Sequence, residues 1–382
     1  MQRLLMLGSG SYKSTLTIRL RDLARHLSGR FDVTMMTPPA DKHNDFTPDY
    51  SLRPEGAKLI QPWQLLTKSP IVNLIPYLIT SFWHIVTSRA DIVYLFKPTP
   101  ITVLGLLPRL WGRTVILDMD DLGSEVMKLE GQSKLNVWLV STSEKLTVRY
   151  SSAVVVGSTY LESILRAKYP KKRILVLPNG VEPSDYNDVA ESQPRHGIYF
   201  FGGMNRIELM EDLLRALPAV VEAVPDVVVT IAGGGSALEG VKKLAHDLNV
   251  DQRITFTGWL TDMLSVQAHT HFADLGICYQ PDTQTVRAAS NMKVFQYMAM
   301  RTVPVVSDVG DLRRYVQDGK AGAVVKPDDS QALATALIEL LQDDERRAQL
   351  ANQAYHLARE EYSWEARAKR VADFMTEGGR RG

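Results

Sequence analysis

The chain has almost no cysteine and almost no net charge. Cys278 is the only cysteine among 382 residues, which excludes an intramolecular disulfide framework and indicates a reducing compartment. Because Cys278 lies in the largely apolar run 273–279, we interpret it as a small buried residue rather than a catalytic thiol. Lysine and arginine (44) balance aspartate and glutamate (43) to a net charge of +1. A protein whose main ligand is a nucleic acid usually carries a stronger basic field, so we expect no nucleic-acid partner.

Long hydrophobic runs are also lacking. No stretch reaches the roughly 18 apolar residues that span a bilayer, and no signal-peptide pattern follows the N-terminus. We therefore expect a cytoplasmic protein, placed at the inner face of the membrane if its acceptor is a lipid. The segment from Ser69 to Val86 is apolar, contains Trp83, and is flanked by Lys68 and Arg89. Either it is a buried helix that Pro76 interrupts, or it is an interfacial helix that docks on lipid.

In place of such runs, the chain alternates short apolar strands with amphipathic helices. At about 150 residues per domain, this length suggests two domains. The apolar segments of the first half lie at residues 4–7, 31–36, 91–96, 114–117, 153–156 and 174–177, and those of the second half at 198–201, 227–232, 254–256, 275–278, 302–306 and 322–325. The polar stretch that follows Val181 and continues through Asn187 to Pro194 is typical of an interdomain linker. We predict an α/β fold of two doubly wound Rossmann-like domains, residues 1–180 and 181–361, facing each other across a cleft that binds ligands.

A glycine-rich turn follows the first strand. Gly8 and Gly10 lie between that strand and a helical pattern, as at the start of a nucleotide-binding unit. The turn is not a P-loop, because Tyr12 stands before Lys13 where a glycine is required, and the third Rossmann glycine is missing. The glycines therefore either permit a tight turn or let a ligand approach the backbone closely.

Carboxylates gather where another predicted strand ends. Asp118, Asp120 and Asp121 directly follow the strand 114–117, and ligands of open α/β sheets collect at the carboxyl ends of strands. Three carboxylates in four residues favour a metal site or a general base. The structural alternative is that Asp121 caps the next helix while Asp118 bonds to local backbone.

The stretch from Arg287 to Asp311 predicts a loop, a helix at 292–300, a strand at 302–306 and a second loop. The first turn of that helix offers unpaired N–H groups and a positive dipole end, which suit an anion. Lys293 lies in this turn, where a cation opposes the dipole. A bound phosphate would explain the lysine; the alternative is a solvated lysine on a surface helix.

Several motifs of the second half resemble those of GT-B glycosyltransferases, most closely the retaining group called glycosyltransferase family 4. The motifs are PNGV at 178–181, GGG at 233–235, TGW at 257–259, KVFQYMA at 293–299, PVVSDVG at 304–310 and EYSWE at 361–365. The last resembles the start of the family's final helix, at about 362–378, which returns to the first domain. In the first half the resemblance is limited to the topology and the Gly8–Gly10 turn.

The resemblance implies a nucleotide-sugar donor bound in the C-terminal domain and a glycan or lipid-linked acceptor bound in the N-terminal domain. It implies sugar transfer with retention of configuration, with no cofactor and no metal. The catalytic candidates are Asp120, Lys293 and Arg206, and the candidates for donor binding are Gly10, Gly203, Gly234, Gly258, Trp259, Arg287, Asn291, Met292 and Gln296. In this assignment Lys293 and the helix amides stabilise the charge that builds on the diphosphate leaving group.

The chain also departs from the family pattern. The family's diphosphate-binding arginine and lysine are replaced by glycine and Glu208, so that Arg206 would have to act from a shifted position. The family's Glu-x7-Glu pair becomes Ala288 and Gln296, and Asp120 stands nearest to a common family histidine. These changes favour a second hypothesis, a non-catalytic paralogue that binds a sugar nucleotide or glycan and partners an active transferase. An epimerase or phosphorylase of the same fold fits the motifs less well.

Overall fold

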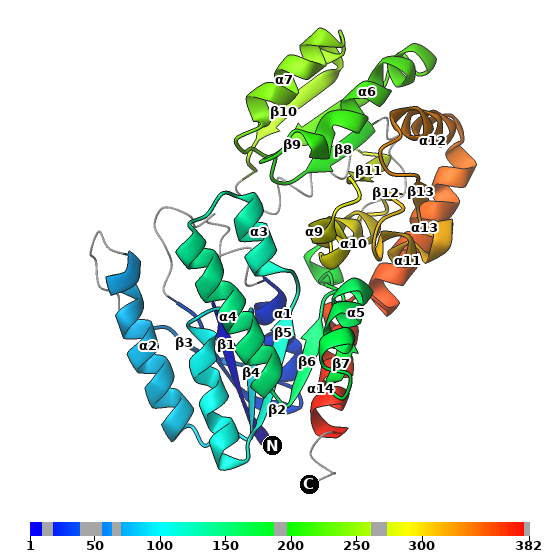
Figure 1. Ribbon diagram of the computed structural model, residues 1–382. Coiled ribbons are helices and arrows are strands. Elements are labelled where there is room, and N and C mark those ends of the chain that lie inside the picture. The colour runs from blue at the N-terminus through cyan, green and yellow to red at the C-terminus, as the bar shows by residue number, and fades with distance from the viewer. Residues whose placement is uncertain (10–17, 39–55, 63–69, 187–196, 261–272, 378–382) are drawn as a thin grey trace. The chain divides into compact units, whose positions relative to one another are not determined.

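The computed structural model describes residues 1–9, 18–38, 56–62, 70–186, 197–260 and 273–377 (Figure 1). The chain forms two compact units. Unit 1 comprises Met1–Asn179, Ala288–Ser290 and Trp364–Gly382, and unit 2 comprises Gly180–Arg287 and Asn291–Ser363. No feature of the sequence indicates that a segment as short as Ala288–Ser290 belongs to unit 1. Among the described helices, none has the length and apolar character needed to cross a bilayer.

Unit 1 is built on a seven-stranded parallel sheet with strand order β3-β2-β1-β4-β5-β6-β7, the order typical of a Rossmann-like sheet. Its strands are β1 Gln2–Gly8, β2 Phe31–Met36, β3 Lys58–Ile60, β4 Ile92–Phe96, β5 Thr114–Met119, β6 Ala153–Val156 and β7 Arg173–Val176. Its helices are α1 Ile18–Leu27, α2 Pro70–Thr87, η2 Thr102–Trp111, α3 Gly123–Leu129, α4 Lys134–Tyr150, α5 Thr159–Lys168 and α14 Trp364–Glu377. Every residue of β4 and β6 is buried, because helices cover both faces of the sheet.

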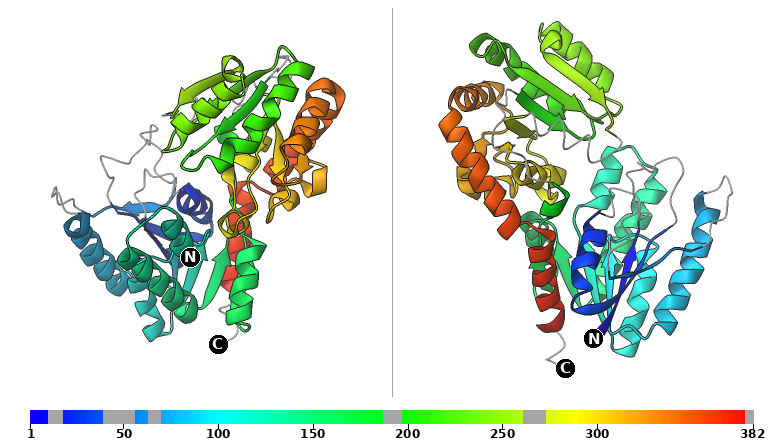
Figure 2. Two further views of the ribbon diagram at one scale, coloured as in Figure 1. Left: turned by 45° about the horizontal axis from the view of Figure 1, so that its top comes forward. Right: turned by 180° about the vertical axis from the view of Figure 1, so that it is seen from behind.

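Alternate residues of the strands supply the two cores of unit 1. Leu4 and Met6 pack with α1 and α14 on one face, while Leu5 and Leu7 pack with residues of α2, α4 and α5 on the other. Helix α14 lies beside α1 (Figure 2). The C-terminal helix is therefore an integral part of unit 1, with Trp364 fully buried in its core.

Unit 2 is built on a six-stranded parallel sheet with strand order β10-β9-β8-β11-β12-β13. Its strands are β8 Gly197–Phe201, β9 Val228–Ala232, β10 Ile254–Gly258, β11 Leu275–Cys278, β12 Val303–Ser307 and β13 Ala323–Val325. Its helices are η3 Pro183–Asp185, α6 Glu208–Ala223, α7 Leu238–Asp247, η4 Asp251–Arg253, α9 Gln284–Ala288, whose last residue belongs to unit 1, α10 Met292–Ala299, α11 Leu312–Tyr315, η5 Gln317–Gly319, α12 Ser330–Gln342 and α13 Asp344–Glu360. Gly276 has no space for a side chain, because the ring of Tyr297 packs directly on β11.

Two predictions about local structure are wrong. Strand β5 continues to Met119, so Asp118 lies inside the strand and not after it; its carboxylate is tolerated there because an arginine side chain pairs with it. Pro76 lies within the continuous helix α2 and does not interrupt it. The predicted linker begins with the short helix η3, Pro183–Asp185, and its part from Asn187 to Pro194 lies outside the described residues.

Candidate functional site

Three glycine-containing loops meet at the carboxyl edge of the unit 2 sheet. They follow β8, β9 and β10. The amide of Met204 donates to the carbonyl of Gly234 over 2.8 Å, and the amide of Gly233 donates to the carbonyl of Gly258 over 2.8 Å. The predicted residues Gly203, Gly234 and Gly258 are thus brought together, at the edge where parallel α/β sheets bind ligands.

Trp259 lies directly over this junction. A Cβ atom added to Gly234 would be 2.5 Å from the indole Nε1, and one added to Gly203 would be 3.8 Å from the ring. Gly234 therefore cannot carry a side chain while the indole occupies this place. Trp259 remains 49% exposed, so the ring offers an aromatic surface for stacking next to backbone that a ligand can approach closely.

Lys293 adds a cation to the same edge of the sheet. Its Nζ lies 4.3 Å from the centroid of the Phe200 ring, and a Cβ on Gly202 would be only 3.0 Å from it. Within the described parts of the chain, Lys293 takes part in none of the ion pairs. Desolvation by burial lowers the pKa of Lys293. A desolvated ammonium without a carboxylate partner is unfavourable by itself, and a bound anion would compensate it.

The N-terminus of α10 is open as well. Its N-cap residue, Asn291, makes no side-chain capping bond, and its Oδ1 accepts only a long hydrogen bond of 3.4 Å from Gln280. The Nδ2 atom of Asn291 is buried and finds no partner among the described residues. Met292 and Gln296 are half-buried on the same helix. The first turn of α10 therefore presents unpaired donors beside Lys293.

The two predicted arginines differ in their surroundings. Arg287 forms a bidentate ion pair with Asp282, with both N–O distances at 2.6 Å, so its guanidinium already has a carboxylate partner. Arg206 is half-buried in the loop between β8 and α6, the loop that also carries Gly203. Gly10 lies outside the described residues.

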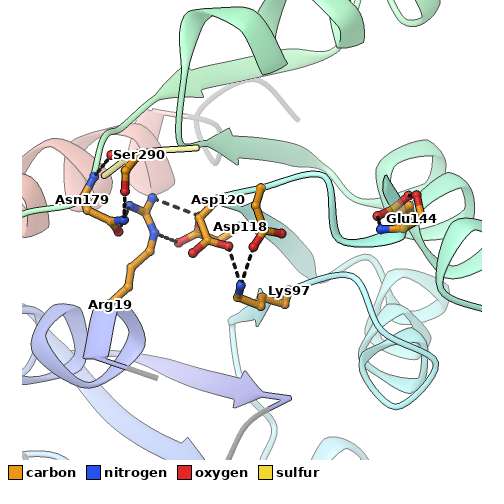
Figure 3. Close-up of polar contacts among 9 residues, drawn as sticks. Arg19, Lys97, Asp118, Asp120, Glu144, Asn179 and Ser290 are labelled. Atoms are coloured by element: carbon orange, nitrogen blue, oxygen red, sulfur yellow. Dashed lines mark hydrogen bonds and ion pairs between the residues drawn. The ribbon is translucent and has the colours of Figure 1, made fainter. Parts of the chain in front are cut away.

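In unit 1, Asp118 is bound by side chains from two other elements, of which Figure 3 shows Arg19. Arg19 of α1 donates to both carboxylate oxygens, over 2.8 and 3.0 Å, and the hydroxyl of Tyr94 donates over 2.5 Å. Arg19 and Asp118 are almost completely buried. Burial raises the pKa of Asp118, and Arg19 opposes that shift. The interpretation that Asp118 bonds to local backbone is therefore wrong.

Asp120 and Asp121 share a different cation. Lys97 Nζ lies 3.1 Å from Asp120 Oδ1 and 2.8 Å from Asp121 Oδ2. Burial would lower the pKa of Lys97, but the two carboxylates outweigh it and raise this pKa. Asp121 does not cap α3, because Glu144 of α4 accepts hydrogen bonds from the amide and hydroxyl of Ser124 there.

No metal site is formed by these aspartates. Across residues 1–9, 18–38, 56–62, 70–186, 197–260 and 273–377, no group of three His, Cys, Asp or Glu side chains could hold a metal ion. Arg19 and Lys97 supply the positive charge that a metal would otherwise bring to the aspartates.

The prediction of site residues omitted the partners of these carboxylates. Arg19 is 99 residues from Asp118 and 160 from Asn179, to which its Nη1 donates over 3.2 Å. Nothing in the sequence around Arg19 distinguishes it from an exposed helical arginine. Asn179 was visible only as part of the PNGV motif, which by itself assigned no contact to its side chain.

Comparison with known proteins places these observations in a family. Residues 15–180 match the family model described as glycosyl transferase 4-like domain, and residues 195–343 match the one described as glycosyl transferases group 1. The GDP-mannose-dependent alpha-(1-6)-phosphatidylinositol monomannoside mannosyltransferase of Mycolicibacterium smegmatis is 33% identical over 307 residues, which cover 76% of this chain and 77% of that protein.

Solved structures show the same fold. Sucrose-phosphate synthase from Thermosynechococcus elongatus superposes with a TM-score of 0.74 at 20% identity, covering 98% of this chain and 99% of that one. Anabaena HepE in complex with UDP and glucose gives a TM-score of 0.73 at 16% identity, covering 99% and 100%. The predicted α/β fold and the resemblance of the motifs are thereby confirmed. The chain belongs to the GT-B glycosyltransferases and, among them, resembles glycosyltransferase family 4.

Proposed function

We propose that the chain transfers a sugar from a nucleoside-diphosphate sugar to a glycan or lipid-linked acceptor, with retention of the anomeric configuration. The observation that carries this proposal is the environment of Lys293. Lys293 lies in the first turn of α10, and its desolvated ammonium lies against Phe200 and Gly202. In the ion pairs between described residues, this ammonium has no carboxylate partner. Such a site suits a diphosphate, whose negative charge would pair with Lys293 and the free helix amides.

The donor would occupy the carboxyl edge of the unit 2 sheet. The nucleobase would stack on the exposed face of Trp259, and Gly203 and Gly234 would admit the nucleotide to within contact of the backbone. Arg206, from the same loop as Gly203, would add a second cation for the diphosphate. The Mycolicibacterium relative is named as dependent on GDP-mannose and specific for a phosphatidylinositol monomannoside, which makes GDP-mannose the first donor to test and a lipid-linked sugar the first acceptor.

In the proposed reaction an acceptor hydroxyl attacks the anomeric carbon while the bond from that carbon to the diphosphate breaks. Negative charge develops on the leaving phosphate, where Lys293 and the α10 amides stabilise it. The acceptor proton passes to the departing phosphate oxygen, which suits attack on the face that the leaving group vacates and hence retention. Asp120, which forms an ion pair with Lys97, would bind the acceptor hydroxyl.

A nucleotide-binding screen followed by a transfer assay tests this proposal. Because a ligand that binds only the folded state stabilises it, GDP, UDP and ADP should be compared by the rise in melting temperature they cause. We expect one nucleoside diphosphate to raise it with increasing concentration, and the matching nucleotide sugar to be consumed with acceptor. The configuration of the product is then read from its anomeric NMR signals. Absence of any nucleotide-dependent stabilisation would contradict the proposal.

One observation favours the second candidate, a binding protein without catalytic activity. Ala288, at the position of a family carboxylate, is completely buried in the apolar core of unit 1, and Ser158 binds its carbonyl over 2.9 Å. Since alanine has no polar side-chain atom, no carboxylate acts from this position. Nucleotide binding with no turnover of any donor sugar would support this candidate.

Membrane contact is a further part of the proposal, and it is based on exposed apolar residues of unit 1. Helix α2 packs against η2, and η2 against α4. We call the exposed residues of these elements the apolar face. They are Ile75, Ile79, Phe82, Trp83 and Val86 on α2, Leu110 and Trp111 on η2, and Leu135, Trp138, Leu139, Leu146 and Tyr150 on α4.

The charges around the apolar face fit an anionic lipid surface. Helix α2 contains no Asp, Glu, Lys or Arg. The only acid of α4, Glu144, is hydrogen-bonded to Ser124, whereas its basic residues Lys134, Lys145 and Arg149 are exposed. Exposed tryptophan with flanking cations is typical of surfaces that bind at the membrane interface.

Trp83→Glu is expected to abolish flotation of the protein with anionic vesicles. Trp83 is 64% exposed, so the change costs little folding stability, but it places a charge where the side chain would enter the interface. We expect a loss of vesicle affinity of at least about tenfold, from lost apolar burial and added repulsion. Val228→Glu, a substitution of an apolar residue of unit 2 that is 51% exposed, is the control and should float as the parent does. Failure of the parent protein to bind vesicles would remove this part of the proposal.

A further inference from the structure

A three-residue segment of the chain leaves unit 2 and returns to it directly before α10. Ala288, Ala289 and Ser290 pack with unit 1, while Arg287 before them and Asn291 after them belong to unit 2. Ala288 is 0% and Ser290 7% exposed. Asn291 is the N-cap residue of α10. Contacts that hold Ser290 therefore also constrain the position of Asn291, directly before the first turn of this helix.

Among the described residues, Ser158 and Asn179 of unit 1 donate three hydrogen bonds to this segment. The Ser158 hydroxyl donates to the carbonyl of Ala288 over 2.9 Å. The backbone amide of Asn179 donates to Ser290 Oγ over 2.8 Å, and its side-chain Nδ2 donates to the carbonyl of Ser290 over 2.7 Å. Two of the three therefore come from Asn179 and end on Ser290 (Figure 3).

Asn179 is in turn fixed by the buried ion pair of unit 1. Its Oδ1 accepts from Arg19 Nη1 over 3.2 Å, and the same guanidinium binds both oxygens of Asp118. Asn179 is only 6% exposed, so these bonds are not exchanged for bonds to solvent. The side-chain amide of Asn179 thus joins the buried ion pair to Ser290. Its oxygen accepts from Arg19 and its nitrogen donates to Ser290, so the link needs both an acceptor and a donor.

We propose that Asn179 is a positioning residue for the donor site. By holding Ser290 in unit 1, it fixes the direction in which the chain enters the first turn of α10, and thereby the placement of the Asn291 amide and the Lys293 ammonium. This inference rests on the proposed function of Lys293 in binding the diphosphate. It assigns to the asparagine of the PNGV motif a role that acts through Lys293 and requires no contact with substrate.

Asn179→Asp removes the side-chain hydrogen bond to Ser290 and adds a carboxylate next to Arg19. The aspartate has the same shape and still accepts from Arg19, but it sets an oxygen against the carbonyl of Ser290 where the amide donated a hydrogen bond. We expect the Kd for the nucleoside diphosphate to rise about tenfold or more, the size of effect that follows when a buried carbonyl loses its partner. Ser290→Ala, which removes the acceptor of the Asn179 backbone amide, should give a smaller rise in the same direction. It also serves as the test if Asn179→Asp does not fold.

A double-mutant cycle with Lys293→Met separates positioning from general destabilisation. If Asn179 acts through Lys293, adding Asn179→Asp to Lys293→Met should change the Kd little, whereas independent effects would add. Ser151→Ala is the matched control, because Ser151 is a buried serine of unit 1 whose hydroxyl bonds to Val148 and lies at the opposite, amino edge of the sheet. Additive effects in the cycle, or an unchanged Kd in folded Asn179→Asp, would overturn the proposal.

Hydrogen exchange of the nucleotide-free, full-length protein keeps this test separate from that of the proposed function. We expect Asn179→Asp, but not Ser151→Ala, to accelerate exchange of the amides in the first turn of α10. If exchange accelerates but the parent protein binds no nucleoside diphosphate, the proposed function fails while the mechanical link between Asn179 and α10 stands. If exchange is unchanged, the positioning role of Asn179 is wrong whatever the protein binds.

Discussion

Lys293→Met should lower kcat/KM for the donor by about 10²- to 10³-fold, the loss typical when one group that stabilises the leaving charge is removed. Methionine keeps an apolar chain up to Cε and removes the ammonium together with its contact on the Phe200 ring. Because the lysine is desolvated and lacks a carboxylate partner among the described ion pairs, removing it leaves no counter-charge behind, and the melting temperature should not fall. Steady-state kinetics and thermal unfolding measure the two quantities.

The matched control for this substitution is Lys243→Met. Lys243 is an exposed lysine of α7 in the same unit, and its replacement should leave kcat/KM unchanged. If Lys293→Met were as active as this control, the assignment of the diphosphate to α10 would be wrong.

The pH dependence of nucleotide binding provides a second check on Lys293. Burial lowers the pKa of the free ammonium, whereas a bound diphosphate would raise it again, since opposite charge favours the protonated form. The affinity should therefore be constant at lower pH and should decline as the pH rises through the lowered pKa of the free protein. Titration between about pH 7 and about pH 10 covers the range below the ordinary lysine value. Lys293→Arg should abolish the decline, because arginine stays charged throughout.

Arg19→Met should lower the free energy of unfolding by about 3–5 kcal/mol, the cost of leaving one partner of a buried ion pair without the other. Asp118 is 0% exposed and receives two of its hydrogen bonds from Arg19. Without the guanidinium, the largest opposition to burial is lost, only the Tyr94 hydrogen bond still opposes it, and the pKa of Asp118 rises further above its unfolded value. The neutral carboxyl is tolerated at low pH, so the destabilisation should grow as the pH rises through the folded pKa. Urea unfolding at about pH 5 and about pH 8 measures both effects.

Two further variants provide comparisons for the loss of stability in Arg19→Met. Arg166→Met breaks an exposed i,i+4 pair with Glu162 and should cost only about 0.3–0.5 kcal/mol. Arg19→Met combined with Asp118→Leu replaces the whole pair by apolar side chains and should recover part of the lost stability. A loss for Arg19→Met no larger than that for Arg166→Met would show that Asp118 does not depend on its ion pair.

Features that repeat along the chain could be predicted, and features that join distant residues could not. The positions of the strands follow from apolar runs of fixed length, and the place of Lys293 in the first turn of a helix follows from its local sequence. Gly234 and Trp259 were assigned to one site by resemblance, and the structure shows the indole lying on the glycine. The partners of Asp118 could not be predicted, because Arg19 and Tyr94 approach it from α1 and β4 and each looks ordinary in its own segment.

The sequence by itself determined two Rossmann-like sheets, a glycine-rich edge and a helix that begins with unpaired donors and a lysine, since these depend on periodicity and on neighbours within one turn. Only the tertiary structure decided which charged side chains are already paired with another side chain and which could bind a ligand. It paired Asp118 with Arg19, Asp120 and Asp121 with Lys97, and Arg287 with Asp282, and it left Lys293 stacked on Phe200. It also placed Ser290 in unit 1, where Asn179 donates two hydrogen bonds to it. The physical reason is that the state of a buried polar group depends on the partner that folding brings within about 3 Å, and that partner can come from any part of the chain.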